Sequence, residues 1–371
     1  MPAVFFYISG HGFGHASRQI EVVNALGARR PDVAIVVRTS APRWLFDRTV
    51  RVPITLLPGE CDTGVLQIDS LRLNEQRTIE RADEFYRTLA ERARHEAVLL
   101  GTHAARFVVS DAPPLGCAAA AAAGIPSVVI TNFTWDWIYE GYETQLASAP
   151  QLLPAIRTAY RQADAAWRLP MHGGFATFDN VVDVPFIARH ARHGRDQVRR
   201  TLGLPLARPL VLSSFGGYGV SGFDASALDC LAWYGVVITH RDDSDELKNA
   251  PAGVHQLSES RLYGSGLRYE DLVAASDIVA TKPGYGIVAE CIANDTAVLY
   301  TSRGHFVEYH VLVEAMPKYL RCGFIDHADL FAGRWRAALD RVTASPAPAE
   351  RPPTNGAEII AEMIDQRIGA G

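Results

Sequence analysis

The chain has 371 residues, of which 48% are hydrophobic and 21% charged. Those values are typical of a globular protein with a sizeable core and two or three domains. The net charge of −5 gives no electrostatic case for nucleic-acid binding, and no apolar run is long enough to span a bilayer. The five cysteines include no C-x-x-C pair, which favours a cytoplasmic protein without structural zinc. We expect no leader peptide, because a basic n-region is missing.

The chain opens on a strand, a glycine turn and a helix. Val4–Ile8 is an apolar run typical of a buried strand, and Ile20, Val23 and Leu26 recur at helical spacing. Between them, residues 9–15 read SGHGFGH. Glycines let a ligand approach the backbone, and a histidine at a helix N-terminus is favoured in its neutral, proton-accepting form. The turn therefore predicts a ligand site with a basic imidazole.

Two other interpretations of this turn remain open. A dinucleotide-binding turn has the pattern G-x-G-x-x-G and an acidic residue about 20 positions later. Here His15 takes the place of the third glycine, and the next strand ends in Arg38-Thr39 without an acid. The second alternative is a purely structural turn with solvated histidines.

Strands and helices alternate along the rest of the chain, which predicts an α/β protein with covered parallel sheets. Further strands are expected at Val33–Val37, Phe107–Val109, Ser127–Ile130, Leu210–Leu212, Val236–Thr239, Ile278–Ala280 and Ala297–Tyr300. Helices are expected at Ile79–Ala97, Cys117–Ala123, Leu152–Gln162, Tyr269–Ala275, Ile287–Ala293 and Gly356–Ile368. We expect a first domain over 1–187, a linker over 188–208, a second domain over 209–355 and a C-terminal helix over 356–371.

A second glycine turn, TKPGYGIVAE at residues 281–290, also lies between a strand and a helix. The backbone N–H groups near Gly284 and Gly286 suit a diphosphate, and Lys282 adds a positive charge. Glu290 lies one turn into the helix, where a carboxylate can accept two hydroxyl hydrogen bonds. A tight turn with a solvated lysine is the alternative. The pattern is not a P-loop, since no G-K-[ST] follows the glycines.

Phe215, Gly216 and Gly217 form a weaker phosphate-suited turn after the first strand of the second domain. Two such loops without kinase signatures suggest a nucleotide whose diphosphate is a leaving group. The chain has no D-x-D pair after a strand in a predicted cleft, and Asp242-Asp243 lies in a charged loop. We therefore expect no metal.

Polar and aromatic residues follow two strands of the first domain. Asp111 ends one strand, at the sheet edge that faces a ligand crevice, and can orient His15. Its alternative role is a helix N-cap. The other strand leads into the acceptor candidates Asn132, Phe133, Trp135 and Asp136, which suit a sugar-like or planar molecule unless the aromatic rings pack under the loop.

These motifs resemble the N-terminal, glycosyltransferase-like half of L-arabinokinase from about Val4 to Ile364. The residues that carry the resemblance are Ser9–Ala16, Ser110-Asp111, Thr131–Asp136, Phe215–Gly217 and Lys282–Gly286. The chain is more distantly similar to MurG-type GT-B nucleotide-sugar glycosyltransferases. The resemblance implies two Rossmann-like domains facing a cleft, with the acceptor on the first and the nucleotide sugar on the second.

The resemblance also implies a role for each motif. His15 would be the general base and Asp111 its orienter, while Glu290 would hold the ribose. The diphosphate would lie on Gly284, Tyr285 and Gly286, the donor sugar near Arg303 and Glu308, and the acceptor near His11, Gly12, Phe13 and Gly14. Pro283 and Cys291 depart from the pattern. Kinase activity is not expected, because the segment 114–118 lacks the serines of the kinase phosphate motif.

Together these features predict an inverting, metal-independent glycosyltransferase that uses a nucleoside-diphosphate sugar and a small-molecule acceptor, without a cofactor. Two alternatives stay open: a nucleotide-sugar 2-epimerase or hydrolase on the same fold, and a non-catalytic nucleotide-sugar sensor. The oligomeric state, a homo-oligomer included, is open as well.

Overall fold

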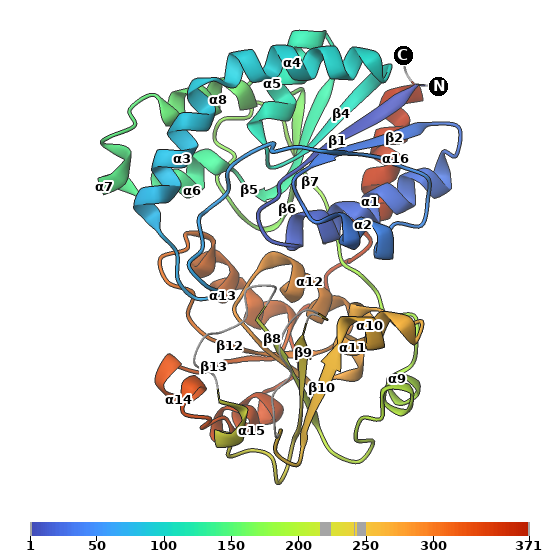
Figure 1. Cartoon of the computed structure of the whole chain (residues 1–371), viewed down its shortest axis with the longest axis vertical. Helices are drawn as coiled ribbons and strands as arrows, with labels where there is room; N and C mark the ends of the chain where they lie inside the picture. Colours follow the sequence, from blue (N-terminus) through green and yellow to red (C-terminus); the bar gives the residue numbers. More distant parts are fainter. Residues whose placement is uncertain (1, 216–223, 241, 243–249, 370–371) are drawn as a thin grey trace.

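The structure is a computed structural model that describes residues 2–215, 224–240, 242 and 250–369. Two α/β domains are stacked along the long axis of the molecule (Figure 1). Each is built on one parallel sheet, and helices cover both faces of it. The predicted fold class, with two Rossmann-like domains, is therefore confirmed.

The N-terminal sheet has the order β3-β2-β1-β4-β5-β6-β7. Its strands are β1 (Ala3–Ile8), β2 (Ala34–Thr39), β3 (Thr55–Pro58), β4 (Ala105–Asp111), β5 (Ser127–Phe133), β6 (Ala165–Gly173) and β7 (Val181–Asp183). Its helices are α1 (Gly14–Arg29), α2 (Arg43–Thr49), α3 (Glu75–Arg87), α4 (Leu89–Thr102), α5 (Pro114–Ala123), α6 (Trp135–Glu140), α7 (Glu143–Leu146) and α8 (Leu152–Tyr160). The carboxyl ends of β1 and β4 lie side by side, with Ile8 opposite Asp111.

The C-terminal sheet has the order β10-β9-β8-β11-β12-β13. Its strands are β8 (Leu210–Ser214), β9 (Gly235–His240), β10 (Val254–Ser258), β11 (Ile278–Thr281), β12 (Ala297–Tyr300) and β13 (Cys322–Phe324). The helices are α9 (Arg195–Leu202), α10 (Glu259–Gly264), α11 (Tyr269–Ala275), α12 (Tyr285–Ala293), α13 (Glu308–Tyr319), α14 (His327–Phe331) and α15 (Arg336–Ala344), with a 3₁₀ turn at Ala225–Ala227. Helix α9 lies inside the segment expected to be a linker.

The prediction of a single helix over Ile79–Ala97 is wrong in one respect. The structure divides this segment into α3 and α4 at Thr88. The backbone of Thr88 leaves the helical region, with ψ at 13°, and its hydroxyl donates to the carbonyl of Phe85 at 3.1 Å. A threonine hydroxyl competes in this way with the helical ladder. The apolar spacing continues across the break and hides it from the sequence.

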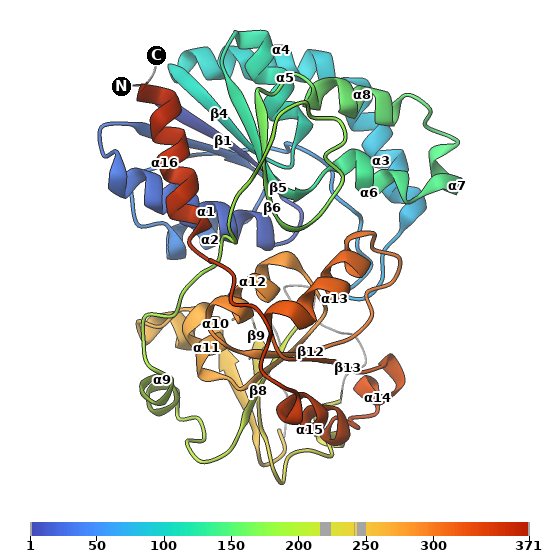
Figure 2. The ribbon, with the colours of Figure 1, turned by 180° about the vertical axis from the view of Figure 1, so that it is seen from behind.

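The C-terminal helix α16 (Gly356–Gly369) crosses back to the N-terminal domain (Figure 2). Ile360 and Ile364 are buried in the core cluster that also contains β1 and α1 residues. Asp365 accepts from Arg29 at 2.8 Å and from Arg30 at 2.7 Å. The last helix therefore packs as part of the first domain.

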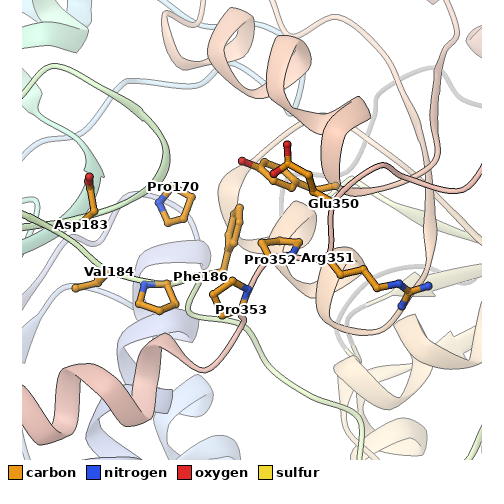
Figure 3. Close-up of a pocket in the computed structure, with 10 residues that line it drawn as sticks. Pro170, Asp183, Val184, Phe186, Glu350, Arg351, Pro352 and Pro353 are labelled. Carbon is orange, nitrogen blue, oxygen red and sulfur yellow. The ribbon is translucent and has the colours of Figure 1, made fainter.

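Two segments that connect the domains run antiparallel at the back of the molecule. Phe186 donates its N–H to Pro353 at 3.3 Å, and Gly356 donates to Phe186 at 2.9 Å. A Cβ on Gly356 would lie 2.4 Å from the carbonyl of Pro185, so this close approach requires glycine. Beside the paired segments lies a groove of about 610 Å³, lined by Pro170, Phe186, Tyr319 and Pro353 among others (Figure 3).

Candidate active site at the domain interface

His15 and Asp111 meet at the edge of the N-terminal sheet. His15 is the second residue of α1, and Asp111 is the last residue of β4. Nδ1 of His15 lies 2.9 Å from Oδ1 of Asp111, and the two residues are 6% and 0% exposed. A carboxylate accepts at this distance only if Nδ1 carries the proton, so the geometry assigns this tautomer. Among the described residues none bonds to Nε2, which is left as the basic nitrogen.

Arg18 fixes Asp111 from the other side. Its Nε donates to Oδ2 of Asp111 at 2.8 Å, and a terminal nitrogen contacts Oδ1 as well. The other terminal nitrogen donates to Asn132 at 2.7 Å. Asp111 is fully buried, yet the charge of Arg18 and the hydrogen bonds overcome this burial and lower the pKa of the carboxyl. Asp111 is thus held as a carboxylate, and helix α5 begins after Pro113 without it.

His11 lies beside His15 in an aromatic cluster. Its ring is 6.4 Å from that of His15 and 5.7 Å from that of Trp135. It also stacks on Phe306 of the C-terminal domain, at 6.1 Å and 7°. Burial, followed by the charge of Arg303, holds the pKa of His11 well below its usual range. His11 is therefore a neutral ring at the meeting point of both domains.

Asp62 is a buried carboxyl in the same cluster. It accepts from the Ser9 hydroxyl at 2.9 Å and from the Trp135 indole at 2.7 Å. The Ser9 oxygen in turn accepts the N–H of His11 at 3.2 Å. Burial raises the pKa of Asp62 to about 6, against the opposing effect of His15. Asp62 thereby ties the first glycine turn to the aromatic loop.

Two cations of the C-terminal domain face this cluster. Lys282 donates to Gln67 at 3.3 Å, and Arg303 lies over the Phe306 ring at 3.8 Å. Neither forms an ion pair with a carboxylate among the described parts of the chain. Burial lowers the pKa of Lys282 to about 7, helped by Arg303, and burial lowers the pKa of Arg303 too. A buried cation and a half-buried one, neither paired with a described carboxylate, suit an anionic ligand.

The N-termini of α1 and α12 approach each other at the interface. Gly284 is the N-cap of α12, and a Cβ on Gly286 would lie 3.4 Å from the Cα of Gly14. The guanidinium of Arg18 lies over the ring of Tyr285, 5.2 Å from the ring centre. Both helix dipoles direct their positive ends at the same region, which favours an anion there.

Glu308 and Asn132 connect the domains directly. Glu308 begins α13, and its Oε2 accepts from the amide of Asn132 at 3.3 Å. Both residues are buried. The predicted acceptor loop and the predicted donor-sugar loop are therefore in contact.

Glu290 is one helical turn inside α12 and is 4% exposed. Arg189, from the linker, donates to its Oε1 at 2.6 Å and lies 3.4 Å from Glu270. Burial raises the pKa of Glu290 to about 7, while Arg189 opposes the rise. Both contacts with Arg189 fall on Oε1.

The remaining predicted site residues divide into those that pack elsewhere and one, Phe133, that contacts His15. Asp136 accepts from Arg157 at 3.0 Å and from Thr177 at 3.1 Å, on the side of α8. Phe13 packs edge-on against Trp44, and the carbonyl of Phe215 accepts from Ser70 at 2.5 Å. Phe133 meets the ring of His15 edge-on at 5.4 Å, and Gly12 has a positive φ of 67°. Gly216, Gly217 and Asp243 lie outside the described residues.

Several site residues were not predicted: Arg18, Asp62, Gln67, Arg189 and Phe306. Arg18 lies three positions after His15, the spacing of neighbours on a helix face, and this signal could have found it. The others come from loops whose position depends on tertiary packing. In the described parts of the chain, no group of three His, Cys, Asp or Glu residues is arranged to hold a metal ion. None of the described helices is long and apolar enough to cross a membrane.

The chain matches no protein-family model. It is 31% identical over 365 residues to the L-arabinokinase of Arabidopsis thaliana, a match that covers 97% of this chain. The chain spans 34% of that protein, about a third of its length.

Solved glycosyltransferases have the same fold as this chain. The glycotransferase of kitacinnamycin aligns with a TM-score of 0.64 at 16% identity, covering 99% of both chains. The glycosyltransferase VinC, solved in complex with DTDP, aligns with a TM-score of 0.56 at 14% identity, covering 99% of this chain and 95% of its own. The chain therefore has the GT-B fold of the glycosyltransferases, and its sequence resembles one part of L-arabinokinase, as the motifs predict.

Proposed function

We propose that this protein is a glycosyltransferase that moves a sugar from a nucleoside-diphosphate sugar to a hydroxyl or amine of a small acceptor, with inversion. The observation that carries the proposal is the arrangement across the interface. His15, with Asp111 on Nδ1, comes from one domain, while Lys282 and the N-terminus of α12 come from the other. A base and an anion site thus face each other.

The reaction follows from these groups. Nε2 of His15 takes the proton of the acceptor hydroxyl as its oxygen attacks the anomeric carbon, which forms the new glycosidic bond. The bond from the anomeric carbon to the diphosphate oxygen breaks, and the diphosphate leaves with the electron pair. Lys282, Arg303 and the α12 amides stabilise its charge, while Asp111 stabilises the imidazolium.

The proposed donor rests on the charged groups at the site and on the similarity to the solved structure of VinC. VinC was solved in complex with DTDP, and a diphosphate suits Lys282 and Arg303 here, which pair with no carboxylate in the described part of the chain. Oε2 of Glu290 would accept from the ribose hydroxyls. Glu308 would accept from the donor sugar, and His11 and Trp135 would contact the acceptor. The five free cysteines fit a reducing compartment such as the cytoplasm.

We further propose that transfer needs no divalent cation, because the helix N-termini and Lys282 supply positive charge where the leaving group forms. Activity should survive EDTA. Loss of activity in the chelator, followed by recovery with Mg²⁺ or Mn²⁺, would contradict this part of the proposal.

Asp62 supports a second candidate, a nucleotide-sugar 2-epimerase or hydrolase. Those reactions need a further acid or base near His15 and no acceptor, and burial raises the pKa of Asp62 to about 6. The donor has to be identified before the candidates are compared, and a thermal-shift screen against a panel of nucleotide sugars identifies it. A ligand at about 100 times its Kd should stabilise the protein by roughly 2.7 kcal/mol.

The proposed donor then decides between the candidates. Release of nucleoside diphosphate only when an acceptor is present supports transfer. Epimerised or hydrolysed sugar without an acceptor supports the second candidate, and binding without turnover would make the protein a sensor.

A further inference from the structure

Arg18 is a buried cation that takes no direct part in the proposed reaction. It lies one helical turn after His15 on α1 and is 4% exposed. Its guanidinium contacts both oxygens of Asp111 and donates to Asn132 at 2.7 Å and to Thr131 at 3.2 Å. A fork contact of this kind fixes both the position and the plane of a carboxylate. Asp111 is therefore held in place by Arg18 before any ligand arrives.

The charge of Arg18 matters as much as its geometry. Oδ1 of Asp111 is shared between Nδ1 of His15, at 2.9 Å, and Arg18. A buried carboxylate alone would favour the charged imidazolium, whereas a general base has to begin the reaction neutral. A terminal nitrogen of Arg18 lies 3.0 Å from Nδ1, so the guanidinium offsets the charge of Asp111 where it acts on the ring.

Other charged groups also surround His15. Asp62 follows β3 and interacts electrostatically with His15, and His11 precedes α1 with its ring 6.4 Å from that of His15. Glu308, from α13, acts on Arg18. Among these groups, Arg18 is the cation in direct contact with both His15 and Asp111.

Arg18 also touches the donor side. Its guanidinium lies over Tyr285 of α12, and its partner Asn132 donates to Glu308 at 3.3 Å. The group that fixes Asp111 is thus in contact with both domains.

We propose that Arg18 is a positioning residue: it holds Asp111 in place and offsets its charge, so that His15 begins the reaction as a neutral base. Its catalytic meaning rests on the proposed function, but its electrostatic effect on His15 exists in the ligand-free protein. The two can therefore be tested apart.

The first test follows the ring signals of His15 by NMR as the pH changes, in the ligand-free protein. His15→Gln identifies the signals by their loss. In Arg18→Gln the titration midpoint of His15 should move to higher pH by about 1–2 units. Arg29→Gln is the matched control, since Arg29 is on the same helix but pairs with Asp365 at the surface. In this variant the titration midpoint of His15 should not move. An unchanged or lower midpoint in Arg18→Gln would overturn the proposal.

Arg18→Lys keeps the test decisive if Arg18→Gln does not fold. An ammonium keeps the charge but cannot bridge both carboxylate oxygens and Asn132, so the midpoint should stay near that of the wild type. The kcat for transfer should fall by about tenfold or more with the donor KM unchanged, and wild-type kcat in Arg18→Lys would overturn the positioning role. If the wild type transfers no sugar, the proposed function fails while the titration result still stands.

Discussion

Lys282 is a half-buried ammonium whose charge changes near neutral pH. Burial and the neighbouring Arg303 lower its pKa to about 7, so it is charged below pH 7 and neutral above. A diphosphate binds the charged form, so the affinity for nucleoside diphosphate should fall as the pH rises through 7. The loss should approach about tenfold per pH unit in calorimetric titrations.

Two lysine variants check the origin of this dependence. Lys282→Met should weaken binding and remove the pH dependence between pH 6 and 9. Lys318→Met is the control, because Lys318 is exposed on α13, and it should bind as the wild type does. The same pH dependence in Lys282→Met would assign the titration to another group.

Glu290 is expected to recognise the ribose through Oε2. Hydrogen bonds to a charged group contribute roughly 1.5–3 kcal/mol, so above pH 7, where Glu290 is a carboxylate, Glu290→Ala should weaken donor affinity by about 10- to 150-fold. Glu290→Gln should lose less, because a carbonyl oxygen remains. Glu270 contacts the same Arg189 at 3.4 Å, which makes Glu270→Gln the matched control. Equal losses in Glu290→Gln and Glu270→Gln would point to the packing of Arg189 instead of the ribose.

At this scale, the sequence predicted residues that lie next to glycine turns and strand ends. Topology alone brings His15 and Asp111 together, since β1 and β4 are neighbours and their carboxyl ends share an edge. Arg189 and Asp62 could not be found in this way, because each reaches the site from an irregular segment. Asp136 was predicted as a site residue but lies elsewhere, because adjacent loop residues point in different directions. Trp135 contacts His11, whereas Asp136 pairs with Arg157.

The short antiparallel pairing of Gln67 with Leu73 closes a turn that contacts the C-terminal domain beside the site. Leu71, at 5% exposure, lies in the core cluster of the C-terminal domain with Val211 and Ile278. Leu71→Ala should lower the free energy of unfolding by about 2–5 kcal/mol, because it removes a large buried side chain from this contact.

Ile68 provides the control for Leu71 on the same turn, because it is 58% exposed. Ile68→Ala should change the free energy of unfolding by no more than about 0.5 kcal/mol. Equal small effects in both variants would mean that Leu71 does not hold the domains together.

Elements with strong periodicity were predictable, and those without it were not. The expected helix at Tyr269–Ala275 has these bounds in the structure, and the strand at Ala297–Tyr300 does too. The strand β13 has only three residues, Cys322–Phe324, which is too short for an alternating pattern to stand out. At the break, the hydroxyl of Thr88 donates to the carbonyl of Phe85, and the spacing of the apolar residues does not reveal this contact.

Strands and helices alternate along the chain in both domains, and this is why the fold could be predicted. The return of α16 to the first domain could not, since a terminal amphipathic helix can pack on either domain. The interface also depends on contacts such as Asn132 with Glu308, which join residues far apart in the sequence. At this scale we propose that the interface is a site of sugar transfer with His15 as its base.

Acceptor-dependent release of nucleoside diphosphate by the wild type and His15→Ala tests this claim most directly. His95→Ala serves as the control, because His95 is exposed on α4. The account predicts that His15→Ala lowers turnover by about 10²–10⁴-fold, the usual contribution of a general base, with donor affinity nearly unchanged and His95→Ala fully active. Full turnover in His15→Ala, with the same donor and acceptor, would contradict it.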